Sequence, residues 1–202
     1  MKILCVGRNY SEHVKELGNA VPENPVIFSK PDTALLKNGE AFYLPDFSND
    51  IHHEIELVIR ISKMGKKIQE KFARNYYQEI GIGIDFTARD LQSKLKEKGL
   101  PWELAKAFDG SAPIGEFISV NGLDLNNIDF TLKKNNHIVQ QGNTAQMIFS
   151  FDKIISFVSQ YFTLKVGDLI YTGTPAGVAK VNKGDKLEGS IGDKVLLNCD
   201  VV

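Results

Sequence analysis

An α+β, strand-dominated fold is predicted by two features of this sequence of 202 residues. Short apolar runs with the two-residue alternation of β-strands recur along the whole chain, whereas segments with helical spacing are few and scattered. Glycine and proline interrupt the runs, and the first elements are too short for a βαβ unit. Many short strands with a few helices are typical of an α+β fold, so we expect strand-rich layers with helices at their periphery.

The first forty residues predict brief elements. The run "KILCV" (2–6) predicts a strand, and the next segment predicts a short helix because Tyr10, Val14 and Leu17 share one helical face. Gly18-Asn19 is expected to end that helix. The runs "VIFSKP" and "TALL" then predict two extended pieces that a proline separates.

The central region predicts two stronger strands. "HHEIELVIR" (52–60) alternates apolar and polar residues, and "YYQEIGIGID" (76–85) follows a turn at Met64-Gly65 and a helix over 69–75. The segment "TARDLQSKLKEKG" predicts a helix that a capping box of Thr87 and Asp90 begins and Gly99 ends.

The C-terminal region predicts a hairpin that turns at Asn135-Asn136 and an apolar helical segment over 147–162. Strands are expected in "DLIYTG", "DKLEGSI" and "KVLLNCDVV". A chain of this length with 43% hydrophobic residues can bury one proper core, so we expect a single domain over 1–202.

Charge and cysteine content exclude several classes of partner. The 24 basic and 25 acidic residues nearly cancel, which argues against nucleic acid or a membrane surface and favours a small molecule. Cys5 and Cys199 lie in apolar runs and are expected to be buried free thiols of a reducing compartment. The N-terminal apolar stretch is too short for a signal peptide, and no run reaches membrane-spanning length. These features predict a cytoplasmic protein.

Acidic residues in the two strong strands suggest a metal site. Glu54 and Glu56 are two positions apart on one strand face, with Cα atoms roughly 6.5 to 7 Å apart, so their carboxylates repel unless water screens them, one is protonated or a cation lies between them. Asp85 ends the second strand and joins them if the strands are neighbours. An all-oxygen set suits Mg²⁺ or Mn²⁺ rather than zinc. His52 is either a further ligand or a surface histidine.

Other polar residues have both a functional and an ordinary interpretation. His13 and Glu16 lie three apart on a predicted helix, where the carboxylate can orient the imidazole as a base, or where both can be solvated. Lys106 is by default a surface lysine. Arg89 and Gln92 fall in the first turn of the helix after Asp85 and can reach the same cleft.

Seven segments in order resemble the fumarylacetoacetate hydrolase superfamily: "GRNYSEHVKE", "FSKP", "HHEIELVI", "GIDFTARDLQ", "GLPWELAKAFDGSAPIG", "QGNTAQMIFS" and "GDLIYTGTPAGV". They are most similar to its single-domain branch of acylpyruvases, oxaloacetate decarboxylases and hydroxyheptadienedioate isomerases. The resemblance runs from residue 7 to about 190. It implies layered β-sheets and a β-roll, a homodimer, and Mg²⁺ or Mn²⁺ held by Glu54, Glu56 and Asp85.

The resemblance also implies the chemistry. A substrate with a pyruvate head would chelate the cation, which stabilises the enolate charge on the 2-oxygen. We therefore expect C–C cleavage, either hydrolysis of an acylpyruvate or fumarylpyruvate or decarboxylation of oxaloacetate. One alternative is a 2-hydroxyhepta-2,4-diene-1,7-dioate isomerase or tautomerase, and another is a non-catalytic metal-dependent carboxylate-binding protein. The family's polar positions correspond to His13 as base, Glu16 as its partner and Lys106 as a catalytic cation, and to the substrate-binding residues Arg8, Lys30, Arg89, Gln92 and Thr174.

Overall fold

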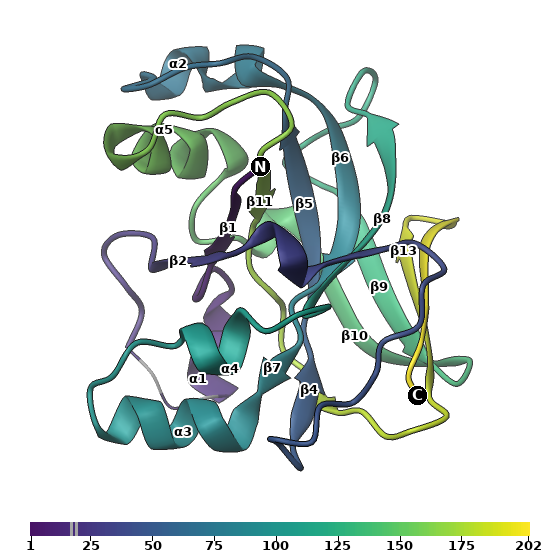
Figure 1. Cartoon of the computed structure of the whole chain (residues 1–202). Helices are drawn as coiled ribbons and strands as arrows, with labels where there is room; N and C mark the ends of the chain where they lie inside the picture. Colours follow the sequence, from purple (N-terminus) through teal and green to yellow (C-terminus); the bar gives the residue numbers. More distant parts are fainter. Residues whose placement is uncertain (17, 19) are drawn as a thin grey trace.

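A seven-stranded sheet forms the centre of the molecule (Figure 1). The computed structural model describes residues 1–16, 18 and 20–202, so the predicted contribution of Leu17 and Asn19 to the first helix lies outside the described residues. Strands β1–β11 and β3–β8 are parallel neighbours, and the other pairs in this sheet are antiparallel. Its order is β2 (Ile27–Lys30), β1 (Ile3–Val6), β11 (Leu169–Tyr171), β5 (Ile55–Ile61), β6 (Tyr77–Ile84), β8 (Ala112–Ser119) and β3 (Leu35–Lys37).

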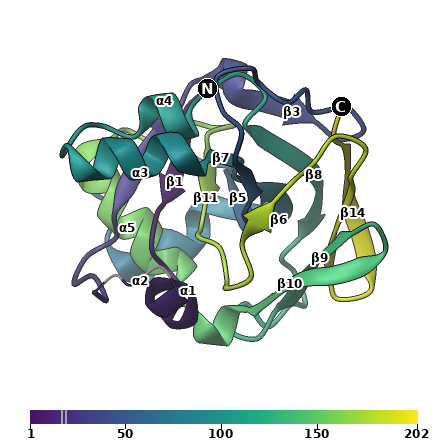
Figure 2. The ribbon, with the colours of Figure 1, turned by 90° about the horizontal axis from the view of Figure 1, so that it is seen from below.

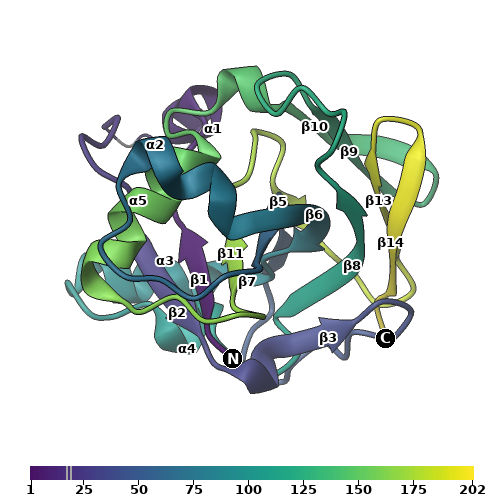
Figure 3. The same ribbon diagram turned by 90° about the horizontal axis from the view of Figure 1, so that it is seen from above.

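Two smaller sheets complete the strand layers. Strand β14 packs on β8 and β6, so the four-stranded sheet covers one side of the central sheet (Figure 3). The layered, curled arrangement confirms the predicted strand-dominated α+β class. The four-stranded sheet contains β10 (His137–Asn143), β9 (Asp129–Lys134), β13 (Lys186–Ile191) and β14 (Lys194–Asp200), and the three-stranded sheet contains β12 (Ala179–Lys180), β4 (Ile51–His53) and β7 (Thr87–Ala88).

The helices gather at two places on the other side of the central sheet. Helix α2 packs on α5 at one end, and α4 packs on α3 at the other, where α1 also lies (Figures 1 and 2). The short strands β4 and β7 lie beside α3 and α4, so this end combines three helices with the ends of several strands. The helices are α1 (Ser11–Glu16), α2 (Glu70–Ala73), α3 (Arg89–Glu97), α4 (Glu103–Lys106) and α5 (Phe151–Tyr161), with 3₁₀ turns at Asp32–Ala34, Arg74–Tyr76 and Thr144–Gln146.

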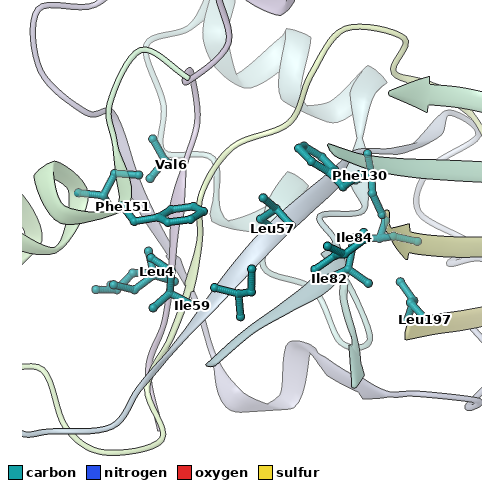
Figure 4. Close-up of a cluster of buried hydrophobic side chains, with 14 of the residues drawn as sticks. Leu4, Val6, Leu57, Ile59, Ile82, Ile84, Phe130, Phe151 and Leu197 are labelled. Carbon is teal, nitrogen blue, oxygen red and sulfur yellow. The ribbon is translucent and has the colours of Figure 1, made fainter. Parts of the chain in front are cut away.

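Strand β5 is buried on both faces. Ile55, Leu57 and Ile59 are fully buried, as their alternation predicts, and each such side chain contributes about 1.5–3 kcal/mol of transfer free energy. The opposite face of β5 is covered as well, because Val58 packs in a second apolar cluster with Tyr171. Figure 4 shows Leu57 between one group formed by Leu4, Val6, Ile59 and Phe151 and another formed by Ile82, Ile84, Phe130 and Leu197.

Most predicted elements are present, with three corrections. The segment "HHEIELVIR" is not one strand, because β4 ends at His53 and β5 begins after Glu54. The predicted capping box is wrong: Thr87 belongs to β7, where its hydroxyl donates to the Asp85 carbonyl at 3.2 Å, and the N-cap residue of α3 makes no side-chain capping hydrogen bond. The described strand β8 and helix α4 were not predicted as elements.

The hairpin turn and the cysteines follow the predictions. Asn135 and Asn136 both have positive φ angles, 52° and 65°, as a two-residue hairpin turn of the primed type requires. Cys5 and Cys199 are both buried free thiols. Within the described residues, none of the helices has the length and apolar character needed to cross a bilayer.

Candidate active site

Three buried carboxylates converge where β5 and β6 meet the short strands. Glu54 occupies the break between β4 and β5, Glu56 lies on β5, and Asp85 follows the end of β6. Strands β5 and β6 pair antiparallel, with Ile55 opposite Ile84, and the Asp85 N–H donates to the Glu54 carbonyl at 2.8 Å. One oxygen from each carboxylate lies within 4.8 Å of the other two. The predicted convergence is therefore confirmed, but in the interior rather than on a solvated face.

Cationic side chains surround this cluster. Lys106 Nζ lies 2.7 Å from both Glu54 Oε2 and Asp85 Oδ2, and Arg89 Nη2 lies 2.5 Å from Glu54 Oε1. Burial alone would raise the pKa of Glu54, but Lys106 and Arg89 hold it well below its ordinary value. Burial likewise opposes the charge of Lys106, whose pKa is nevertheless raised by Asp85 and Glu54. Glu54 is therefore held as a carboxylate and Lys106 as an ammonium group.

Glu56 has fewer polar contacts than Glu54 and Asp85. Its Oε2 accepts one hydrogen bond, at 2.7 Å, from the Gly173 N–H. Burial raises the pKa of Glu56 well above the ordinary value, and the nearby Asp85 charge raises it further. Gly173 has a φ of +103°, and a Cβ added there would lie 2.6 Å from Asn9 Cβ, so only glycine brings this N–H to Glu56.

The donor set fits a divalent cation. Lys30 Nζ lies 2.8 Å from Asp85 Oδ1, but its hydrogen bonds go to the Lys106 carbonyl and to the carbonyl and hydroxyl of Ser111. Asp85 Oδ1 thus keeps no hydrogen-bond donor among residues 1–16, 18 and 20–202, although it is buried. A buried oxygen without a donor, next to two further carboxylates, matches the all-oxygen ligation that Mg²⁺ and Mn²⁺ favour. Because burial and the charge of Asp85 raise the pKa of Glu56, additional positive charge at this place would favour ionisation of this third carboxylate.

His13 and Glu16 reach the same site from α1. His13 is 3% exposed, and its Nδ1 lies 3.1 Å from Glu16 Oε2. The Glu16 carboxylate also accepts from the Gly177 N–H, at 3.2 and 3.3 Å. His13 lines a small recess together with Glu54 and Lys106. The predicted dyad is formed, and its histidine is buried rather than solvated.

The predicted substrate-binding residues divide into two groups. Arg8, Arg89 and Gln92 line the recess, where Arg89 Nη1 donates to Gln92 Oε1 at 2.7 Å. Lys30 and Thr174 are not among the described residues of its lining. The Lys30 ammonium lies behind Asp85, and the Thr174 hydroxyl accepts from Gln140 Nε2 at 3.0 Å. A direct contact of Lys30 or Thr174 with substrate stays a prediction.

Three residues of the recess, Gly7, Lys96 and Trp102, were not singled out from the sequence. Lys96 and Trp102 line it, and Lys96 Nζ lies 5.3 Å from the centre of the indole ring. Burial lowers the pKa of Lys96, and the charges of Arg89 and Arg8 lower it further. Helical spacing was the available signal, because Lys96 is seven residues after Arg89 and thus shares its face of α3.

Two polar neighbours of the carboxylate strand take no part in the cluster. His52 Nε2 lies 3.0 Å from Asp50 Oδ1, and His52 is not part of the converging group of Glu54, Glu56 and Asp85. Arg60 forms an ion pair with Glu79, and its guanidinium lies 4.3 Å from the centre of the Phe117 ring.

Sequence comparisons relate the chain to one protein family. The family described as "Fumarylacetoacetate (FAA) hydrolase C-terminal" matches residues 2–202. An oxaloacetate tautomerase of Escherichia coli (strain K12) is 43% identical over 188 residues, which are 92% of this chain and 86% of that protein. A mitochondrial oxaloacetate decarboxylase of Dictyostelium discoideum is 44% identical over 192 residues, 94% of this chain and 88% of that protein.

A solved structure extends the likeness to the whole fold. The fumarylpyruvate hydrolase of Pseudomonas aeruginosa, crystallised in complex with Mn²⁺ and pyruvate, superposes with a TM-score of 0.93 at 36% identity, covering 100% of this chain and 89% of that one. Both the family match and these relatives span nearly all of the sequence. The chain therefore belongs to the fumarylacetoacetate hydrolase family.

Proposed function

We propose that this protein is a divalent-metal-dependent enzyme that acts on 2-oxo dicarboxylates, with oxaloacetate as its principal substrate. The observation that carries the proposal is the position of the carboxylate cluster, which consists of Glu54, Glu56 and Asp85. It lies beside a recess whose lining includes cationic side chains that are not used in ion pairs among the described residues. Arg8 and Lys96 take part in none of the ion pairs found among residues 1–16, 18 and 20–202. They are free to bind an anionic substrate group.

Glu54, Glu56 and Asp85 would hold Mg²⁺ or Mn²⁺. When bound, the cation supplies Lewis-acid chemistry that withdraws charge from the 2-oxo group of the substrate. We propose that the site accepts either Mg²⁺ or Mn²⁺. The Mn²⁺ in the crystal structure of the Pseudomonas aeruginosa fumarylpyruvate hydrolase supports Mn²⁺. Lys106 keeps Glu54 and Asp85 ionised and adds a fixed positive charge close to the point where negative charge develops in the substrate.

Arg8 and Lys96 would bind the second carboxylate of the substrate. Both side chains line the recess, and the lowered pKa of Lys96, caused by burial and by the charges of Arg89 and Arg8, reports a positive potential there. An oxaloacetate dianion brings two carboxylates to this field, whereas acetylpyruvate brings one. The recess thus favours a dicarboxylate over a monocarboxylate.

His13 would transfer the proton. Its Nδ1 is engaged by Glu16, which leaves Nε2 to take a proton from the substrate or to return one. Interconversion of the enol and keto forms of oxaloacetate needs only such a group and stabilisation of the charge on the 2-oxygen. We therefore propose tautomerisation as the first reaction, in accord with the name of the Escherichia coli relative.

C–C cleavage is the second candidate reaction, as the resemblance to acylpyruvases and decarboxylases implies. One observation favours it: the carboxylate of Glu16 fixes the buried imidazole of His13, an arrangement that can also activate a water molecule. Loss of CO₂ from oxaloacetate and hydrolysis of fumarylpyruvate both develop charge on the same 2-oxygen. Isomerisation of a dienol dicarboxylate shares that requirement, so it belongs to the same experiment.

The experiment compares substrates on the purified protein with Mn²⁺, after chelation and after Mn²⁺ is restored. Enol–keto interconversion of oxaloacetate is followed by absorbance and its decarboxylation by pyruvate release. Hydrolysis is assayed with fumarylpyruvate and acetylpyruvate, and isomerisation with 2-hydroxyhepta-2,4-diene-1,7-dioate. We expect oxaloacetate tautomerisation to be the most efficient reaction and to depend on metal. Undiminished turnover after complete metal removal would overturn the metal's role. Binding of these acids without turnover of any would instead identify a carboxylate-binding protein.

A variant pair tests the dicarboxylate preference. Lys96→Met is expected to raise KM for oxaloacetate about tenfold through loss of a charge-assisted contact, with little change in KM for acetylpyruvate. Lys94→Met is the matched control, because Lys94 is exposed on the same helix. Equal effects of Lys96→Met on both substrates would remove Lys96 from its assigned role.

We further propose a homodimer of the cytoplasm. Phe47 and Leu104 are 54% and 68% exposed and line one apolar groove with Phe108, which supports association with a second copy. The two buried thiols, Cys5 and Cys199, support a reducing compartment. Light scattering on the purified chain tests the dimer, and a mass of one chain would overturn it.

A further inference from the structure

One buried amide connects three separate parts of the chain next to the carboxylate cluster. Gln140 lies on β10, in the four-stranded sheet, and is 2% exposed. Its Oε1 accepts from the Ile55 N–H at 3.0 Å and lies 2.8 Å from His53 Nδ1. Its Nε2 donates to Thr174 Oγ1 and to the Pro175 carbonyl, both at 3.0 Å. The side chain therefore uses its full capacity of two acceptor and two donor bonds.

The chemistry of the partners fixes the orientation of this amide. The Ile55 N–H can only donate and the Pro175 carbonyl can only accept, so Oε1 must face β5 and Nε2 must face the loop. His53 Nδ1 then carries its proton, because Gln140 Oε1 is an acceptor.

Both ends of the amide adjoin the metal-binding carboxylates. Ile55 lies between Glu54 and Glu56, at the break where β4 ends and β5 begins. Thr174 follows Gly173, whose N–H donates to Glu56 Oε2 at 2.7 Å. One side chain thus links the backbone between the two glutamates to the loop that binds one of them.

We propose that Gln140 is a positioning residue of the metal site, which fixes the relative directions of the Glu54 and Glu56 carboxylates by joining their strand to the 173–175 loop. The inference rests on the proposed metal site. Gln140 itself is not a ligand, because its oxygen is occupied by Ile55 and His53. Residues that orient metal ligands in this manner commonly affect metal affinity about 10–100-fold.

Mn²⁺ affinity tests the proposal without any assay of activity. Titration of the metal-free protein, followed by the electron paramagnetic resonance signal of free Mn²⁺, gives the dissociation constant. Gln140→Met keeps the approximate volume of the side chain and removes its hydrogen bonds, and we expect it to raise the Mn²⁺ dissociation constant about 10–100-fold. Gln141→Leu is the matched control on the same strand, because Gln141 is exposed, and it should change the value less than twofold.

Hydrogen exchange separates positioning from general loosening. In metal-free Gln140→Met, exchange of the Ile55 amide should accelerate strongly, whereas the Ile59 amide in the middle of β5 should keep its protection. Equal acceleration at Ile59, or an unchanged Mn²⁺ dissociation constant in the folded variant, overturns the proposal.

Thr174→Val provides a milder variant if Gln140→Met fails to fold. It removes only the hydroxyl that accepts from Nε2, and we expect a threefold to tenfold weaker Mn²⁺ affinity, in proportion to one lost bond of about 0.5–1.5 kcal/mol. Unchanged affinity in Thr174→Val overturns the link to the loop. If the wild-type protein binds no Mn²⁺, the proposed metal site itself is overturned. If the wild type binds Mn²⁺ and the variants bind it with the same affinity, only the role of Gln140 is overturned.

Discussion

Glu54 of the carboxylate cluster and His13 of the His13–Glu16 pair line one recess, but the cluster and the pair are held in different ways. Glu54, Glu56 and Asp85 are 4%, 1% and 1% exposed and belong to or adjoin long strands of the central sheet. Lys106 alone contributes bonds of 2.6 to 2.7 Å to Glu54, Asp85 and Thr87. The pair instead lies on α1, a helix of six residues, where the Glu16 side chain is 36% exposed.

This difference separates binding from proton transfer. A site that must hold a small hard cation needs oxygens at fixed positions, and buried ion pairs with sheet backbone supply them. A proton-transfer group needs only to reach the substrate, and a short helix held by its Gly177 contact suffices for that. We expect changes in the cluster to alter metal binding and stability, and changes on α1 to alter turnover alone.

Glu56→Gln is expected to have the largest effect. The amide retains the shape of the side chain and an acceptor for the Gly173 N–H, but it removes one anionic ligand. We expect Mn²⁺ affinity to fall by more than about 100-fold with little loss of helicity in the circular dichroism spectrum. Metal binding at the wild-type level would show that Glu56 is no ligand.

Lys30→Met tests how far the cluster depends on its buried cations. The Lys30 side chain is fully buried against Asp85, so its removal leaves that carboxylate with less compensation and should lower the free energy of unfolding by about 3 kcal/mol without metal. Added Mn²⁺ should restore more stability in the variant than in the wild type, because it supplies positive charge at the same place. Thermal melts with and without Mn²⁺ measure this, and equal shifts in both proteins would contradict it.

His13→Ala should reduce turnover of oxaloacetate about 100-fold or more, the usual contribution of a positioned acid–base group. Mn²⁺ affinity should stay within about twofold of the wild type, since among the described residues His13 pairs with Glu16 and forms no hydrogen bond or ion pair with the three carboxylates. Steady-state kinetics and Mn²⁺ titration provide the two readouts. A His13→Ala variant that loses metal affinity would remove the distinction between the two regions.

Glu16→Gln is expected to have a smaller effect, about a tenfold reduction in kcat, because the amide still bonds to His13 but no longer stabilises its protonated form. The control is Glu12→Gln on the same helix, where Glu12 is exposed and forms an ion pair with the exposed Lys15. Glu12→Gln should leave kcat unchanged. A similar loss in both variants would indicate that the helix, rather than the dyad, had been disturbed.

The corrections to the sequence predictions have specific physical causes. Periodicity treats "HHEIELVIR" as one strand, but β4 pairs with β7 and β12 whereas β5 pairs with β6 and β11, so the chain passes from one sheet to another at Glu54. Thr87 has the correct spacing for a capping box, yet its hydroxyl accepts from Lys106 Nζ at 2.6 Å, a charged donor that local spacing does not reveal. The unpredicted strand β8 contains Pro113 and Gly115, residues that weaken a strand pattern.

The sequence by itself determined the strand-rich class, the alternation that buries Ile55, Leu57 and Ile59, the Asn135-Asn136 turn and the residue types of a metal site. These properties depend on local periodicity and on the chemistry of single side chains. Only the tertiary structure decided that the carboxylates are buried, that the Lys30 ammonium contacts Asp85, and that Gln140 joins strand β5 to the Gly173 loop. Those relations connect residues distant in the chain, and the sheet order that creates them is set by the packing of the whole core.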